Sequence, residues 1–480
     1  MPPKSDDIGT DFPEDAPTPN RLRDGLTSGE ELELQQLRQL EFWRKHKEEL
    51  RSERLPNSDN DKTSLPARWE LTRGINLHDW QRHCVDAWFD ANERGVIKVV
   101  TGAGKTILAL AIAEKLQQTR RPDLRIAIVV PTLVLLDQWR DEFLKRSNLP
   151  QSAIGLLGGG NDAKFDEHTR VLICVLNSAS KKLAALVEKS HIGSSLLLIV
   201  DECHRAGASE MRRVFATHRS SSLGLSATPE RERDVEDDIG DSFEDDSPPT
   251  NFEDSVLGQE LGPVIFELNY ADAIRLDVLP PFGVRHYGLS LQPDENVQYE
   301  RISREITDLR KELERPGRKG LALMKWCRSR AALNNPAAGR LVGLTTERKR
   351  LLYRMRERKT AVVRILSDAL ADNPNTKAIL FHESIAEVMS LFELLRAERF
   401  PVVAEHSGFP EKMRAASLKL FRDGTAQIIV SARSLIEGFN VPSADLGIIV
   451  AASSSVRQRV QTLGRLLRKS RAVDGMLCIT

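Results

Sequence analysis

The sequence has few cysteines, no long apolar run and no excess of charge of either sign. Its five cysteines lack the Cys-x-x-Cys spacing of zinc and iron–sulfur sites and form no disulfide framework, which favours a reducing compartment. No apolar stretch reaches the roughly 18 residues of a membrane span, and the polar N-terminus lacks a signal-peptide core. We therefore expect a soluble cytoplasmic protein without a membrane partner.

Length and net charge set the scale of the protein but do not identify its partner. Lysine plus arginine and aspartate plus glutamate each number 69, so net charge favours no class of partner. A chain of 480 residues is long enough for two or three domains, each with its own core. The distribution of charge along the chain is therefore more informative than its sum.

The N-terminal extension, residues 1–70, carries no pattern of a packed domain. Its first part is rich in Pro, Asp, Ser and Gly and nearly free of aliphatic clusters, which predicts disorder. Residues 30–54 are dense in Glu, Lys, Arg and Leu and predict a charged helix. We expect this helix to be solvated, with a contact to a partner protein as the alternative.

A glycine turn between a predicted strand and a predicted helix carries the functional prediction. Residues 96–100 are rich in β-branched apolar side chains (Val96, Ile97, Val99 and Val100), and an alanine-rich helical pattern runs from residue 107 to residue 116. This context is that of a phosphate-binding loop, in which backbone N–H groups and a helix N-terminus bind phosphate. Val99 stands where the opening glycine of the motif usually lies, and a chance turn is the alternative. The candidate nucleotide-binding residues are Thr101, Gly102, Ala103, Gly104, Lys105 and Thr106.

Two adjacent acids, Asp201 and Glu202, follow the buried strand predicted at residues 196–200. Open α/β sheets bind ligands at this end of their strands, and adjacent buried carboxylates are costly without a cation. Downstream of a phosphate loop, we assign Asp201 and the Thr106 hydroxyl to Mg²⁺ and Lys105 to the β- and γ-phosphates of ATP. Glu202 is then expected to orient and deprotonate the attacking water.

A pair of arginines near the C-terminus is the candidate for charge stabilisation. Arg465 and Arg468 lie three residues apart on one face of the helix predicted after Gln461. Such spacing is usually a basic helix surface. The pair could instead complete the nucleotide site from another domain, and an arginine of this kind changes the rate by about 10³- to 10⁵-fold.

Apolar runs separated by helical patterns predict an α/β protein with mostly parallel sheets. We place a first domain at residues 71–263, with an acidic loop at 234–254. We place a second at residues 264–480, beginning with an apolar, strand-like region that reaches residue 291. The chain stops shortly after an apolar run at 476–479, which favours a fragment of a longer protein. The clearest predicted strands are residues 125–130, 171–175, 196–200, 223–225, 378–381, 401–404, 427–430 and 446–450.

A basic helical insertion is predicted at about residues 292–360. Between residues 318 and 359, lysines and arginines are opposed only by Glu347 and Glu357 within the segment. One interpretation is a solvated surface that offsets the acidic loop. The other is a phosphate-contacting surface beside a nucleic-acid channel. Arg348, Lys349 and Arg350 are the cluster through which we test the second.

The ordered series of motifs resembles that of the superfamily 2 helicases. It is most similar to the XPB-like and restriction-enzyme-like DEAD/DEAH group, because Gln461 replaces the histidine of DEAD-box motif VI. Gln81 resembles the adenine-reading glutamine, residues 102–106 motif I, residues 131–139 motif Ia and residues 201–204 motif II in its DECH spelling. Residues 226–228 resemble motif III, residues 381–384 motif IV, residues 431–442 motif V and residues 461–468 motif VI.

This resemblance implies two RecA-like domains that grip nucleic acid and close on ATP and Mg²⁺. It implies nucleotide contacts from Gln81 and Gly438, coupling by Ser226 and Thr228, and completion of the site by Gln461, Arg465 and Arg468. We expect an ATP hydrolase that acts as a helicase or translocase, with double-stranded DNA favoured over RNA. The alternatives are a nucleotide-gated DNA- or protein-binding adaptor with slow turnover, and an RNA helicase. No nuclease motif is visible, and the insertion has no counterpart that we can align.

Overall fold

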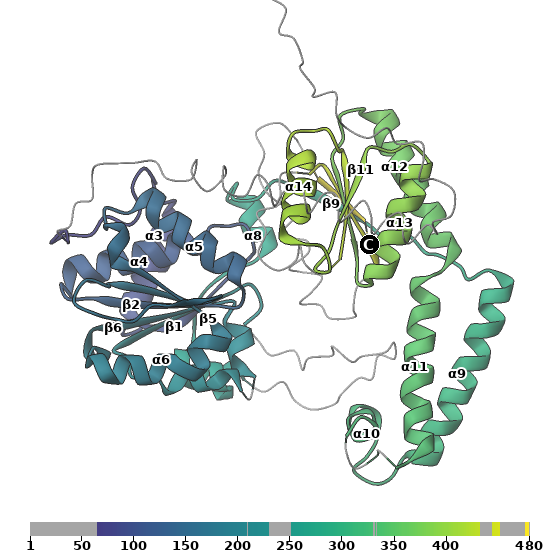
Figure 1. Cartoon of the computed structure of the whole chain (residues 1–480), viewed down its shortest axis with the longest axis horizontal. Coiled ribbons are helices and arrows are strands. Elements are labelled where there is room, and N and C mark those ends of the chain that lie inside the picture. The colour runs from purple at the N-terminus through teal and green to yellow at the C-terminus, as the bar shows by residue number, and fades with distance from the viewer. Residues whose placement is uncertain are drawn as a thin grey trace, which may run out of the picture. The chain divides into compact units, whose positions relative to one another are not determined.

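The computed structural model describes residues 65–208, 210–229, 251–329, 332, 334–432 and 444–451, and the backbone of 476–479 (Figure 1). All of these belong to the compact unit Thr63–Thr480. The predictions for the N-terminal extension up to residue 64, for the acidic loop up to residue 250 and for motif VI lie outside the described residues. No helix in the described ranges combines the length and apolar character that a membrane span requires.

The first sheet has eight strands in the order β4-β3-β5-β2-β6-β7-β1-β8. Among the described strands of this sheet, only β4 runs antiparallel, to β3. Parallel pairing brings the carboxyl ends of the strands to one edge, where the predicted site residues follow them. The strands are β1 (Arg94–Val99), β2 (Arg125–Val130), β3 (Ile154–Gly158), β4 (Asn161–Asp162), β5 (Val171–Val175), β6 (Leu196–Asp201), β7 (Ser221–Ser226) and β8 (Val264–Leu268).

Helices cover both faces of this sheet, which explains the continuous apolar runs of its strands. In β2, Ile126 and Ile128 pack with α3 (Asp79–Asp90), α4 (Lys105–Thr119) and α5 (Leu133–Arg146). The alternate residues Ala127 and Val129 pack with α6 (Leu176–Ser190) on the opposite face (Figure 1). Shorter elements complete this part of the chain: η1 (Gln151–Ala153), η2 (Gly193–Ser195), η3 (Cys203–Gly207), η4 (Met211–Ala216), η5 (Phe252–Asp254) and α7 (Val256–Leu261).

The connection between the two sheets differs from the prediction. β8 pairs in parallel with β1, so a domain boundary between residues 263 and 264 separates β8 from the sheet that it joins. The predicted strand-like region up to residue 291 also contains a helix, α8 (Tyr270–Arg275), before β9 (Phe282–Arg285). Asn269 caps α8, since its side chain accepts a hydrogen bond from the Asp272 backbone N–H at 2.9 Å. The apolar composition of the region concealed this helix start.

The second sheet has six strands in the order β11-β12-β10-β13-β14-β9, all paired in parallel. Helices α12 (Arg356–Asp372) and α13 (Ile385–Ala397) pack on one face, against residues such as Leu380 and Val430. Figure 1 shows α14 (Glu411–Arg422) on the other face. The remaining strands are β10 (Ala378–His382), β11 (Val402–Glu405), β12 (Ile428–Ser431), β13 (Leu446–Ala451) and β14 (Met476–Ile479).

The insertion is helical, as predicted, and has an apolar core of its own. It consists of α9 (Pro293–Leu313), α10 (Gly320–Cys327) and α11 (Pro336–Tyr353). α9 and α11 lie side by side (Figure 1), and the pairs Arg340–Glu305 and Arg301–Glu347 give them an antiparallel register. α12 instead packs on the second sheet, so the insertion ends at Tyr353 rather than near residue 360.

Candidate nucleotide-binding site

The predicted phosphate loop joins β1 to α4, which begins at Lys105. Gly102 and Gly104 have φ values of 93° and 90°, in the left-handed region where a side chain is strained. The α4 N-terminus therefore opens at the carboxyl edge of the sheet with its first backbone N–H groups available to an anion. The Thr101 hydroxyl oxygen is buried without a hydrogen-bond partner in the described part of the chain. This arrangement suits a phosphate group.

Gln81 lies beside this loop. It is buried on α3, and its Oε1 accepts the backbone N–H of His78 at 2.9 Å. A Cβ at Gly104 would stand 3.4 Å from the Gln81 Nε2. The structure therefore brings the glutamine of the motif series to the glycine turn, although the two are far apart in sequence.

An ion pair joins the phosphate loop to the acidic motif. Lys105 Nζ lies 3.2 Å from Glu202 Oε1, and the two side chains are only 10% and 14% exposed. Glu202 directly follows β6 and has left-handed backbone angles, φ 46° and ψ 51°. A non-glycine residue rarely adopts this conformation, and such outliers gather at functional sites. The turn carries the Glu202 carboxylate to the lysine.

Asp201 is buried at the end of β6, and both of its carboxylate oxygens are held. Its Oδ2 accepts the indole N–H of Trp139 at 2.9 Å, and its Oδ1 accepts the backbone N–H of Glu202 at 2.9 Å. Burial, and then the charge of Glu202, raise the pKa of Asp201, while Lys105 and the indole hydrogen bond oppose that increase. A cation at this position would favour the ionised carboxylate.

The sequence placed Trp139 in motif Ia but gave it no role at the site. Leu136, Trp139 and Phe143 form the buried face of α5 at helical spacing, so burial of the tryptophan could have been predicted. Its hydrogen bond to Asp201 could not, because it joins residues 62 positions apart.

A hydrogen-bonded chain connects the acidic motif to the end of β7. His204 is buried, and its Nδ1 lies 3.1 Å from Ser226 Oγ and 3.6 Å from Glu202 Oε2. The Ser226 hydroxyl also accepts the backbone N–H of Thr228 at 3.1 Å. The two residues predicted to couple hydrolysis to movement are therefore linked to Glu202 through His204.

The residues at this edge fit Mg²⁺ bound together with a nucleotide. The Thr106 hydroxyl and the Asp201 carboxylate are hard oxygen donors, and Mg²⁺ usually takes only one or two protein ligands besides water and phosphate. Within the described ranges, no group of three His, Cys, Asp or Glu side chains could hold a metal.

The second-domain part of the predicted site lies outside the described residues: Gly438, Gln461, Arg465 and Arg468. The described ends of motifs IV and V lie at the carboxyl edge of the second sheet. Ser431 Oγ donates to the buried Glu405 carboxylate at 2.9 Å, and Arg414 pairs with the same carboxylate at 2.6 Å. Motif V therefore begins from a strand end fixed by a buried ion pair.

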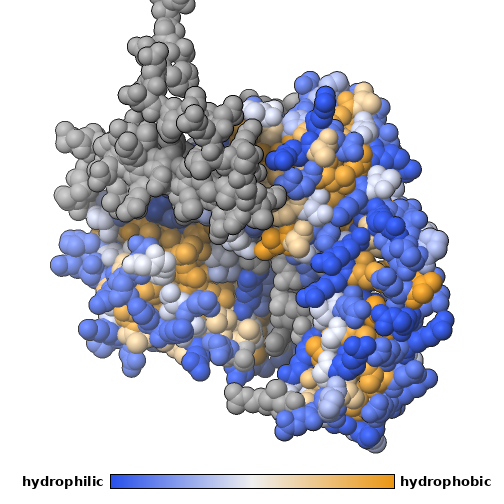
Figure 2. Space-filling model, turned by 45° about the vertical axis from the view of Figure 1, so that its right-hand side comes forward, coloured by the Kyte–Doolittle hydropathy of each residue, from blue (hydrophilic) through white to orange (hydrophobic). Residues whose placement is uncertain are grey.

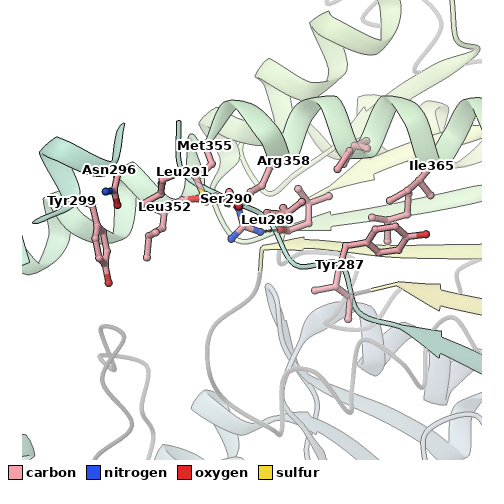
Figure 3. A pocket seen from close by; sticks show the side chains of 15 residues that line it. Tyr287, Leu289, Ser290, Leu291, Asn296, Tyr299, Leu352, Met355, Arg358 and Ile365 are labelled. Atoms are coloured by element: carbon pink, nitrogen blue, oxygen red, sulfur yellow. Dashed lines mark hydrogen bonds between the residues drawn. The ribbon is translucent and has the colours of Figure 1, made fainter. Parts of the chain in front are cut away.

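A pocket of about 730 Å³ lies on the second sheet rather than at the phosphate loop (Figure 3). Its walls come from β13, α12 and residues 287–299, and they are mainly aliphatic and aromatic. Arg358 closes one side by donating to the backbone carbonyls of Leu352, at 3.0 Å, and of Val450. None of the described motif I or motif II residues lines this pocket, so its volume does not bear on nucleotide binding.

The basic residues of the insertion meet acids from other elements, contrary to the prediction. Lys349 pairs with Glu383 at 3.1 Å, and Arg354 pairs with Glu387 at 3.2 Å. Arg348 is only 5% exposed. The expectation that only Glu347 and Glu357 oppose these charges was therefore wrong, because it counted acids within the segment alone. Of the predicted test cluster of Arg348, Lys349 and Arg350, only Arg350 is exposed.

Comparison with known proteins identifies the family. Residues 74–231 match the type III restriction enzyme res subunit, and residues 360–470 match the helicase conserved C-terminal domain. The DNA 3'-5' translocase XPB2 of Sulfurisphaera tokodaii is 28% identical over 82% of this chain and 79% of that protein. The chain is a superfamily 2 helicase of the XPB-like and restriction-enzyme-like group. A putative DNA 3'-5' helicase Rad25 of Haloarcula marismortui is 26% identical over 83% of the helicase chain, which spans only 51% of that relative.

Solved structures confirm the predicted fold. The Hef helicase domain of Pyrococcus furiosus has a TM-score of 0.50 and 18% identity over 83% of this chain and 94% of that one. The ATP-dependent type ISP restriction-modification enzyme LlaBIII bound to DNA has a TM-score of 0.56 and 17% identity over 85% of this chain and 28% of that one. The two parallel sheets of this helicase are therefore two RecA-like domains, as its sequence predicted.

Proposed function

We propose that this helicase hydrolyses ATP and uses the cycle to move along or unwind DNA, with double-stranded DNA favoured over RNA. The observation that carries the proposal is the Lys105–Glu202 ion pair, which joins the phosphate-binding lysine to the hydrolytic carboxylate at one sheet edge. The preference for DNA follows from the relatives, whose names describe DNA translocases and helicases. The chain spans only 51% of the Haloarcula marismortui relative, so the substrate of that whole protein is only proposed for this chain.

In this proposal, the phosphate loop and Lys105 bind the β- and γ-phosphates of ATP, and Gln81 contacts the adenine. Glu202 accepts a proton from the attacking water, and general-base catalysis of this kind contributes about 10²- to 10⁴-fold in rate. Thr106 and Asp201 would hold Mg²⁺, which would supply positive charge to offset the charge that develops on the phosphates. The backbone N–H groups at the start of α4 keep the phosphates beside the Glu202 carboxylate.

The second RecA-like domain is proposed to complete the reaction. Arg465 and Arg468 would stabilise charge on the γ-phosphate, with Gln461 and Gly438 as further contacts from the same domain. Ser226 and Thr228 would transmit the state of the nucleotide, since the Ser226–His204 contact of 3.1 Å connects them to the acidic motif. Movement on DNA then follows from closure and reopening of the two domains during each ATP cycle.

We propose that the insertion contacts phosphate groups of the nucleic acid. The proposal applies only to its exposed basic side chains that are not engaged in ion pairs. Figure 2 shows hydrophilic side chains over much of its visible surface, with hydrophobic patches between them. A partner protein at the charged segment of residues 30–54, outside the described ranges, is a separate proposal. The exposed basic residues of the insertion are Arg301, Arg304, Lys311, Arg315, Lys319, Lys325, Arg328, Arg340 and Arg350, and of these Arg301, Arg304 and Arg340 form ion pairs.

The second candidate is a nucleotide-gated adaptor that binds DNA or a protein and turns ATP over slowly. Steady-state ATP hydrolysis by the full chain discriminates between the two, measured alone and with duplex DNA, single-stranded DNA and RNA. The proposed motor gives turnover that rises most with duplex DNA and is lost in Lys105→Ala. Slow turnover that none of the nucleic acids changes would support the adaptor, and stimulation by RNA alone would support an RNA helicase.

A further inference from the structure

Trp139 is the last residue of motif Ia, and the motif series assigns it no role at the nucleotide site. It lies in the middle of α5, is 1% exposed, and its only polar atom meets the Asp201 carboxylate at 2.9 Å. The second Asp201 oxygen is held by a backbone N–H at 2.9 Å. Two donors on two different oxygens fix the plane of the carboxylate.

The chemistry of the indole suits a carboxylate that must also bind a cation. An indole N–H is a donor only and carries no charge, so it orients the carboxylate without neutralising it. Each Asp201 oxygen accepts one of these two hydrogen bonds and keeps a further lone pair. Lys105, the cation nearby, pairs with Glu202 instead, at 3.2 Å. In these contacts, both groups that donate hydrogen bonds to the Asp201 carboxylate are neutral.

We propose that Trp139 is a positioning residue for Mg²⁺, acting by holding the Asp201 carboxylate in the orientation that receives the ion. The inference rests on the proposed function, in which Asp201 binds the metal. Partners that orient a metal-binding group typically change metal affinity or activity by about 10- to 100-fold when they are removed. The hydrogen bond between Trp139 and Asp201 also connects α5 to the proposed metal-binding side chain. α5 begins directly after Thr132 of motif Ia.

The test measures metal binding rather than turnover. Mn²⁺ is titrated by electron paramagnetic resonance into the full chain with a non-hydrolysable ATP analogue, for wild type and Trp139→Phe. The phenylalanine ring retains most of the apolar packing and lacks the N–H. The matched control is Trp88→Phe, because Trp88 is 0% exposed and donates its Nε1 hydrogen bond to the Ser222 carbonyl at 3.1 Å.

The expected result is an Mn²⁺ affinity about 10- to 100-fold weaker in Trp139→Phe, with wild-type affinity in Trp88→Phe. Affinity for the analogue without metal should be unchanged in both. Replacing Trp139 by 3-benzothienylalanine, which puts sulfur in place of the N–H in a ring system of the same shape, should weaken Mn²⁺ binding equally.

Equal Mn²⁺ affinity in wild type and both position-139 variants would overturn the inference about Trp139 and leave the proposed function intact. An equal loss of analogue affinity without metal would also overturn it, since that result indicates a general deformation of the site. If wild type itself bound no Mn²⁺ with the analogue, the proposed function would fail, and the inference with it.

Discussion

Glu202→Gln should separate ATP binding from ATP hydrolysis and should strengthen binding. Lys105 is paired with Glu202 at 3.2 Å, so phosphate groups of ATP that bind the ammonium would compete with this carboxylate. A hydrogen bond between charged groups contributes about 1.5–3 kcal/mol, and 1.4 kcal/mol is a factor of ten in Kd. Removing the carboxylate charge should therefore raise ATP affinity about tenfold or more. Hydrolysis should fall by about 10²- to 10⁴-fold, because the general base is lost.

The assay pairs fluorescence titration of a labelled ATP with steady-state hydrolysis at saturating ATP. Glu93→Gln is the matched control, because Glu93 is another buried carboxylate of the same domain and pairs with Arg120 and Arg121 at 2.9 and 2.6 Å. It should change the temperature of unfolding without changing ATP affinity. Weaker ATP binding in Glu202→Gln, with unchanged hydrolysis per bound ATP, would refute the assigned roles.

Three further predictions follow from other parts of the chain. Arg465→Ala and Arg468→Ala should each lower ATP turnover by about 10³-fold or more with little change in ATP affinity; unchanged turnover would remove the second domain from the site. Arg350→Glu should flatten the slope of log DNA affinity against log salt by about 0.9 if the side chain contacts one phosphate, and an unaltered slope would favour a solvated surface. Burial lowers the pKa of His382 to about 4, so its neutral form stabilises the fold above pH 6.5 and up to about 3 kcal/mol is lost as pH falls toward 4. His382→Asn should reduce that loss in hydrogen exchange of β10, whereas the same change at His168, which is exposed, should leave it intact.

The sequence predicted the central strands of both sheets because their residues are buried on both faces, whereas the partly buried β3 and the exposed β4 were not predicted. β2 and β5 have the predicted bounds, since Ile128, Ile173 and their neighbours form unbroken apolar runs. α8 was missed because its signal, the Asn269 cap, lies within an apolar region. The first-domain boundary was misplaced for a similar reason: sequence alone does not state which sheet β8 will join.

The candidate site was predictable only as far as its motifs are local. Glycine turns, adjacent acids and helix starts are read from neighbouring residues, so Lys105, Asp201 and Glu202 could be selected. Contacts across the chain were not visible, including the Trp139 indole on Asp201 and the Glu383 carboxylate on Lys349. The Lys349–Glu383 ion pair removes Lys349 from the basic cluster that was predicted to contact phosphate. A run of charged residues therefore indicates a binding surface only when its partners from other elements are known.

The most direct test of the central claim is displacement of a third strand from a DNA triplex by the full chain. The triplex-forming strand leaves when a motor passes along the duplex beneath it, whether or not that duplex is unwound. The account predicts displacement with ATP and none with a non-hydrolysable analogue, and none by Lys105→Ala with either nucleotide. DNA-stimulated ATP hydrolysis without displacement of the third strand would contradict the motor and leave the nucleotide-gated adaptor.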